Sequence, residues 1–112
     1  MSPRKILAGS LFLTLSMIAA CSSGATSTGI EQLSCSPDST LTYDNFGGDV
    51  IASQCMSCHD SESPKLGTLA QVRSHAQQIM EAAVYTNAMP EEGTMSLEER
   101  RLLGEWLACG AP

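Results

Sequence analysis

The chain is poor in aromatic side chains, in positive charge and in long apolar runs, and each shortage narrows what it can be. Only five of its 112 residues are aromatic, so a folded domain here has little large apolar surface of its own to bury. No segment alternates convincingly between apolar and polar residues, which argues against a β-sheet domain. No apolar run reaches the roughly 20 residues that a transmembrane helix needs.

The N-terminal residues predict export from the cytoplasm. Arg4 and Lys5 give a positive start, and residues 6–20 form an apolar run of fifteen residues broken only by small polar ones. A positive start followed by a short apolar run is the layout of a secretory signal, which places the signal peptide at residues 1–20.

The signal ends in the letters IAAC, with the cysteine at position 21. This ending resembles the lipobox of bacterial lipoproteins, in which cleavage precedes the cysteine and its sulfur receives a diacylglyceryl group. An ordinary signal peptide followed by a chance cysteine is the alternative. Ser22 resembles the residue that directs lipoproteins to the outer membrane of Gram-negative bacteria. We therefore expect lipidation at Cys21 and a location at the periplasmic face of a bacterial membrane, the outer one.

The pentapeptide at positions 55–59, Cys-Met-Ser-Cys-His, is the most informative feature of the chain. C-x-x-C-H is the attachment signature of a c-type haem. The thiols of Cys55 and Cys58 are spaced to add across the two vinyl groups of one porphyrin, and His59 then supplies the proximal ligand to iron. The carbonyl of Pro64 is a candidate partner for the other ring nitrogen of His59.

Two other interpretations of the C-x-x-C pair are weaker. A thioredoxin-like redox motif needs a βαβ context, and no strand pattern surrounds these cysteines. A zinc site needs a second pair of ligands at a suitable spacing, and the only later candidates are His75 and Cys109, which lie far apart in the sequence. One covalently bound haem c is therefore the expected cofactor.

Five cysteines in an exported protein need an explanation. Lipid accounts for Cys21 and haem for Cys55 and Cys58, which leaves Cys35 and Cys109. Two such thiols in an oxidising compartment are expected to form a disulfide, although two unpaired thiols remain the alternative. The pairing predicts that the two ends of the folded domain lie side by side.

The pattern of apolar residues predicts an all-α domain over residues 35–112, preceded by a flexible linker over residues 21–34 that is rich in Ser, Thr and Gly. Helices are expected over residues 43–58, over residues 68–85 and from Ser96 onward. The second and third helices open with the capping-box sequences TLAQ and SLEE.

An electron carrier needs a second axial ligand, and a thioether in that place raises the reduction potential. Met89 is the best candidate, because Pro90 holds the preceding backbone extended and away from helix. Met95, His75 and an open or water-bound site are the alternatives.

The order of helix, C-x-x-C-H, connecting helix, Met-Pro loop and terminal helix with an aromatic resembles the small monohaem cytochrome c fold of class I. The resemblance covers residues 43–112 and implies three to four helices around one covalently bound haem. It implies that His59 is the proximal ligand and Met89 the distal one. It also implies that Trp106 packs against the first helix near Phe46 and Gly47.

These observations predict a carrier of single electrons between redox proteins, with no substrate and no enzymatic reaction. From Cys21 onward, four basic residues stand against twelve acidic ones, a net charge of −8. That charge argues against nucleic acid and favours a partner with a basic or neutral docking face. A haem-based gas or ligand sensor, or an electron-entry subunit of a larger oxidoreductase, are the alternative functions.

Overall fold

The computed structural model describes residues 24–91 and 94–112. The predicted signal peptide and the candidate lipidation site Cys21 lie outside the described residues. Within the described ranges, no helix is both long and apolar enough to span a bilayer.

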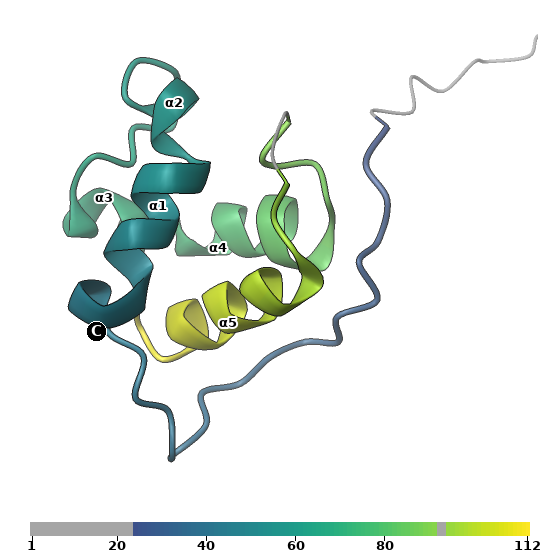
Figure 1. Ribbon diagram of the computed structural model, residues 1–112, viewed down its shortest axis with the longest axis vertical. Coiled ribbons are helices and arrows are strands. Elements are labelled where there is room, and N and C mark those ends of the chain that lie inside the picture. Colours follow the sequence, from purple (N-terminus) through teal and green to yellow (C-terminus); the bar gives the residue numbers. More distant parts are fainter. Residues whose placement is uncertain (1–23, 92–93) are drawn as a thin grey trace, which may run out of the picture.

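The domain is mainly helical, as predicted, and the described residues contain no strand beyond an isolated bridge between Ser27 and Thr86. Two of the helical elements, labelled η, are wider π-type turns. In chain order the elements are η1 (Tyr43–Gly47), α1 (Gly48–Gln54), α2 (Met56–His59), α3 (Leu69–Ser74), α4 (Ala76–Ile79), η2 (Met80–Tyr85) and α5 (Leu97–Ala108) (Figure 1).

The first two predicted helices are present as broken segments rather than as single rods. The first breaks at Cys55, whose φ of −118° separates α1 from α2. The second breaks at His75, with φ −109° and ψ 14°. The Gln71 carbonyl is shared there by two groups of His75, the backbone N–H and Nδ1 of the ring, which lies 2.9 Å from it. Local side-chain bonds of this kind compete with the regular hydrogen bonds of a helix.

The two predicted capping boxes are confirmed. Gln71 N–H donates to Thr68 Oγ1 at 3.2 Å and Thr68 N–H donates to Gln71 Oε1 at 3.0 Å. Ser96 and Glu99 make the same reciprocal pair at the start of α5. A third box, between Thr42 and Asn45, opens η1 and was not predicted, because asparagine replaces the usual Glu or Gln.

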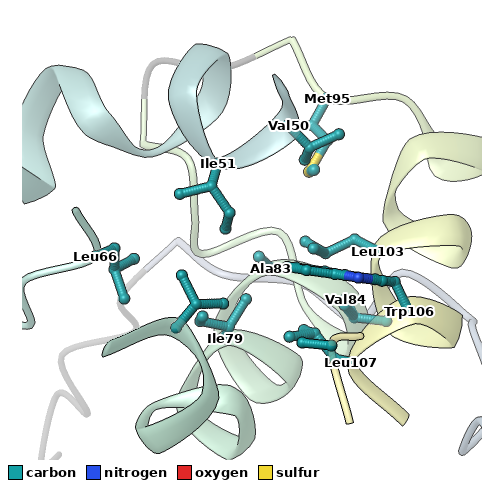
Figure 2. Packing of buried hydrophobic residues seen from close by; sticks show 12 residues of the cluster. Val50, Ile51, Leu66, Ile79, Ala83, Val84, Met95, Leu103, Trp106 and Leu107 are labelled. Atoms are coloured by element: carbon teal, nitrogen blue, oxygen red, sulfur yellow. The ribbon is translucent and has the colours of Figure 1, made fainter. Parts of the chain in front are cut away.

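Twelve buried apolar residues form the core between the helices (Figure 2). They are Val50, Ile51, Leu66, Val72, Ile79, Ala83, Val84, Met95, Leu103, Trp106, Leu107 and Ala111. Most come from α1, from the segment α3–α4–η2 and from α5, so all three predicted helical regions contribute to one core.

Trp106 is fully buried and lies directly against Gly47. A Cβ atom at Gly47 would overlap the six-membered part of the indole ring, so only glycine allows η1 to approach α5 this closely. The indole N–H donates to the Pro112 carbonyl at 3.2 Å. On the same helix, a Cβ at Gly104 would lie 2.7 Å from Cγ1 of Val84, which marks a second close approach, between α5 and η2.

Residues 26–33 lie alongside the end of η2, and we call them the N-terminal strap (Figure 1). Thr28 N–H donates to the Tyr85 carbonyl at 3.0 Å, and Thr26 and Asn87 exchange a reciprocal pair of bonds. The sequence assigned these residues to a linker, whereas in the structure the strap makes specific hydrogen bonds with the folded domain.

The structure contains a disulfide between Cys35 and Cys109, the pair expected from the sequence. It joins residues 74 positions apart and fixes the end of the strap to the end of α5. The two ends of the domain therefore lie side by side.

The contact between Gly47 and Trp106 predicts that Gly47→Ala destabilises the domain. The backbone at Gly47 is helical and would itself favour alanine, but the new methyl group overlaps a buried ring, and such overpacking costs about 1–3 kcal/mol. We expect the midpoint of thermal unfolding to fall by at least about 5 °C, measured by circular dichroism. Gly67→Ala is the control, because its methyl would lie 3.6 Å from Met56 Cε, an ordinary contact. Equal midpoints in the two variants would disprove the packing argument.

The disulfide predicts a second loss of stability. Replacing both Cys35 and Cys109 with serine opens a long loop in the unfolded chain, which should lower the free energy of unfolding by about 2–4 kcal/mol in chemical denaturation. A reducing agent should bring the unmodified protein to the same midpoint as the double variant, and should leave the variant unchanged. An unmodified protein indifferent to reduction would contradict this expectation.

Candidate functional site

Cys55, Cys58 and His59 share one helical turn at the junction of α1 and α2. The carbonyl of Cys55 accepts hydrogen bonds from Cys58 N–H at 3.3 Å and from His59 N–H at 2.9 Å. Residues three apart on a helical turn are neighbours on its surface, so the two thiols lie on one side of the turn. Neither thiol is in a disulfide, Cys55 is half-buried and Cys58 is exposed.

The ring of His59 is oriented by the chain that follows it. Nδ1 lies 2.9 Å from the carbonyl oxygen of Pro64, as the sequence suggested. A carbonyl oxygen only accepts hydrogen bonds, so Nδ1 carries a proton, and in the neutral imidazole Nε2 then keeps its lone pair. No group within the described residues hydrogen-bonds to Nε2. A histidine in this state is ready to bind a metal ion through Nε2, and such ligands usually donate their other N–H to a carbonyl in this way.

The segment between His59 and Leu66 is fixed at both ends, which keeps Pro64 in place. Glu62 N–H donates to the Cys58 carbonyl at 2.8 Å, and Leu66 N–H donates to the His59 carbonyl at 3.2 Å. The side chain of Leu66 is buried in the core (Figure 2). The position of the Pro64 carbonyl is therefore set by the core and by the turn that carries the cysteines.

Burial raises the pKa of the Cys55 thiol to about 11. Cysteines that act as nucleophiles in redox dithiols have a lowered pKa, because the thiolate is the reactive form. The surroundings of Cys55 thus differ from those of a thioredoxin-like pair.

A closed zinc site would require three or four ligands in one place. Over residues 24–91 and 94–112, no group of three or more His, Cys, Asp or Glu side chains is close enough to hold a metal ion. Cys55, Cys58 and His59 accordingly do not themselves form such a group, and no other side chain in this part of the protein completes one with them.

Met89 lies outside the helices, in the segment that follows η2, and its backbone is held from both sides. Its N–H donates to the Ala82 carbonyl at 2.8 Å, and its carbonyl accepts a bond of 2.7 Å from Nη1 of Arg100. Its side chain is partly buried against the core. In Figure 1, α2 and the segment after η2 both extend beyond α4 and α5 at the same end of the domain.

Met95 and His75, the other two candidates for the distal ligand, lie in different surroundings. Met95 is only 7% exposed and lies in the core beside Val50 (Figure 2). His75 bonds to the Gln71 carbonyl and lines a cavity of about 590 Å³ together with Pro64 and Lys65.

Arg100 is a feature of this region that was not anticipated. Its side chain is 5% exposed, and among the described residues it forms no ion pair. Burial lowers the pKa of its guanidinium from the ordinary value. One feature of the sequence indicates that Arg100 is buried. It lies three and seven residues before Leu103 and Leu107, which is the spacing of core residues on one face of α5.

A cavity of about 620 Å³ lies between the strap and the elements α4, η2 and α5. Neither this cavity nor the one beside His75 is lined by Cys55, Cys58, His59 or Met89. The fit of the site to haem therefore depends on its donor atoms: two neighbouring thiols and an imidazole with a free Nε2. These atoms match what covalent haem attachment requires.

Comparison of the chain with protein-family models, with curated proteins and with solved structures found no match. The function is accordingly inferred from the geometry around Cys55, Cys58, His59 and Met89.

Proposed function

We propose that this protein is a monohaem c-type cytochrome that carries single electrons between redox proteins. The hydrogen bond between His59 Nδ1 and the Pro64 carbonyl is the observation that carries the proposal. It selects the tautomer that a proximal ligand needs, on the same turn as two cysteines without a disulfide partner. Bound haem would supply a one-electron Fe(III)/Fe(II) couple, which no side chain of the chain can supply.

Cys55 and Cys58 would hold the porphyrin covalently. Each thiol would add across one vinyl group, with its sulfur on one carbon and its proton on the neighbouring carbon, so the attachment would need no oxidant. Thiols three positions apart on one turn can reach two substituents of the same ring. The half-buried position of Cys55 also suits an apolar partner. His59 follows directly and presents Nε2.

Met89 would supply the distal ligand. Its backbone is fixed at both its N–H and its carbonyl, so little ordering entropy is lost when the side chain takes a single position. Met95 is buried in the core among apolar residues, which favours Met89 over it. A thioether in this place raises the reduction potential relative to a second imidazole.

The proposed fold is that of a small class I cytochrome c. The helical domain and the contact of Trp106 with Gly47, near the start of the first helical segment, support this assignment. So does the order of the site residues, with the C-x-x-C-H turn after the first segment and Met89 before the last helix.

The proposed partners are redox proteins with a basic docking face, since basic residues are scarce throughout the described domain. We also propose that the protein is anchored by lipid at Cys21 to the periplasmic face of a bacterial membrane, the outer one. An anchored carrier of this kind exchanges electrons with partners at that surface and transforms no small-molecule substrate.

The attachment proposal predicts that Cys55→Ala/Cys58→Ala removes covalent haem. The protein should be made in a host that matures c-type cytochromes, and the haem followed by peroxidase staining on denaturing gels. We expect a stained band for the unmodified chain and none for this double variant. The variant that lacks Cys35 and Cys109 is the matched control and should keep its stain, because those thiols take no part in attachment. A stained Cys55→Ala/Cys58→Ala band would refute the proposal.

The ligand assignment predicts that Met89→Leu removes the weak near-infrared band of sulfur-to-iron(III) charge transfer. Leucine keeps nearly the volume of methionine and removes only the sulfur, so packing changes little. Met95→Leu and Met80→Leu are the controls, and both should keep the band. Its survival in Met89→Leu, or its loss in Met95→Leu alone, would assign the ligand elsewhere.

A further inference from the structure

We propose that Arg100 is a positioning residue that holds the segment carrying Met89 in the geometry needed to bind iron. This inference rests on the function proposed above, because it assigns to Arg100 a role in presenting the distal ligand. It goes further by naming a residue on α5 as a determinant of the strength of that ligation.

One nitrogen of Arg100 connects the end of η2 to the segment that follows it. Nη1 lies 2.7 Å from the Ala83 carbonyl, 2.7 Å from the Met89 carbonyl and 3.4 Å from the Thr86 carbonyl. These acceptors lie on both sides of the point where the chain leaves η2. A single donor group therefore fixes the path of the chain between residues 83 and 89.

The peptide groups on both sides of Met89 are then constrained. The Met89 N–H is bound to the Ala82 carbonyl, and the Met89 carbonyl is bound to Arg100. Only the side chain of Met89 keeps freedom to adjust. Loss of the bond from Arg100 would release one of the two points that fix the backbone of the ligand.

Burial of this guanidinium is costly and calls for a specific reason. Arg100 is 5% exposed, and within residues 24–91 and 94–112 its hydrogen-bond acceptors are carbonyl groups rather than carboxylates. Leucine or methionine on the same stripe of α5 would fill the core without removing a charge from water. Arg100 instead lowers the stability of the domain and fixes the positions of three carbonyl groups, one of which belongs to Met89.

The neighbouring Arg101 provides a matched control. It is exposed and pairs with Glu98 at 2.7 Å and with Glu105 at 3.4 Å on the surface of α5. The same substitution at positions 100 and 101 removes the same charge and the same side chain from one helix. Only position 100 contacts the Met89 segment.

The geometry also predicts which substitution restores the role. All three bonds to the Ala83, Thr86 and Met89 carbonyl groups come from Nη1, so these bonds do not require the forked shape of the guanidinium. A lysine ammonium has three N–H groups on one nitrogen and can serve the same carbonyl groups. We therefore expect Arg100→Lys to retain the function and Arg100→Met to lose it.

The test measures how easily an external ligand displaces Met89 in the oxidised, haem-loaded protein. Imidazole binds the iron only when the thioether is off, so its apparent affinity reports the fraction of detached Met89. Arg100→Met should bind imidazole about tenfold more tightly than the unmodified protein, as expected for loss of a charged hydrogen bond, and its near-infrared sulfur band should weaken. Arg100→Lys should stay within about threefold of the unmodified protein, and Arg101→Met should not change.

Thermal unfolding is measured in parallel, because replacing the buried Arg100 with methionine also changes the packing of the core and the stability of the domain. A purely structural role would lower the midpoint in Arg100→Met while leaving the imidazole affinity at low temperature unchanged, and that result would overturn the inference. Should Arg100→Met fail to fold, Arg100→Gln and Arg100→Lys decide. Tighter imidazole binding by the glutamine variant than by the lysine variant supports the role, and equal affinities refute it.

The two proposals fail in different ways. Absence of covalent haem from the unmodified protein would overturn the cytochrome assignment, and the role of Arg100 with it. Covalent haem with a normal sulfur band, combined with equal imidazole affinities in the Arg100 and Arg101 variants, would overturn the role of Arg100 alone.

Discussion

The contact between Gly47 and the ring of Trp106 holds the first helical segment against α5, and the rest of the domain is arranged around it. Trp106 supplies the largest buried side chain in a protein with few aromatics, so its position defines the core. Because Gly47 lacks a side chain, η1 can approach Trp106 of α5 closely. Because Gly104 lacks one, η2 can approach α5 closely as well. The turn with the cysteines follows α1, which continues from η1, and the segment with Met89 follows η2.

The proposed ligands are held by the same physical device, which is a hydrogen bond to or from a carbonyl group. His59 donates from Nδ1 to the Pro64 carbonyl, and the Met89 carbonyl accepts from Arg100. In each case the bond fixes an orientation without using the atom that would face iron. Leu66 and Arg100, which secure the two arrangements, are both buried, so the core determines the geometry of the site on either side.

The features that could be read from the sequence are those decided within a few residues. The C-x-x-C-H turn, the caps at Thr68 and Ser96 and the helical regions depend on local bonding and on periodicity, and the structure contains them. The strap could not be read in this way, because Thr28 bonds to backbone groups of Val84 and Tyr85 that any sequence would offer. The breaks at Cys55 and His75 could not be predicted from periodicity either, because the apolar stripe of a helix continues through a kink.

Arg100 shows where a conflict between local rules carries information. A charged residue at the spacing of core residues interrupts an apolar stripe, and in the structure its Nη1 donates to three carbonyl groups, one within η2 and two in the segment that follows it. Burying this charge lowers the stability of a small domain that also depends on a disulfide between its ends. A domain with so little core keeps an expensive interaction only where position matters more than stability, and the segment that Arg100 fixes is the one that carries Met89.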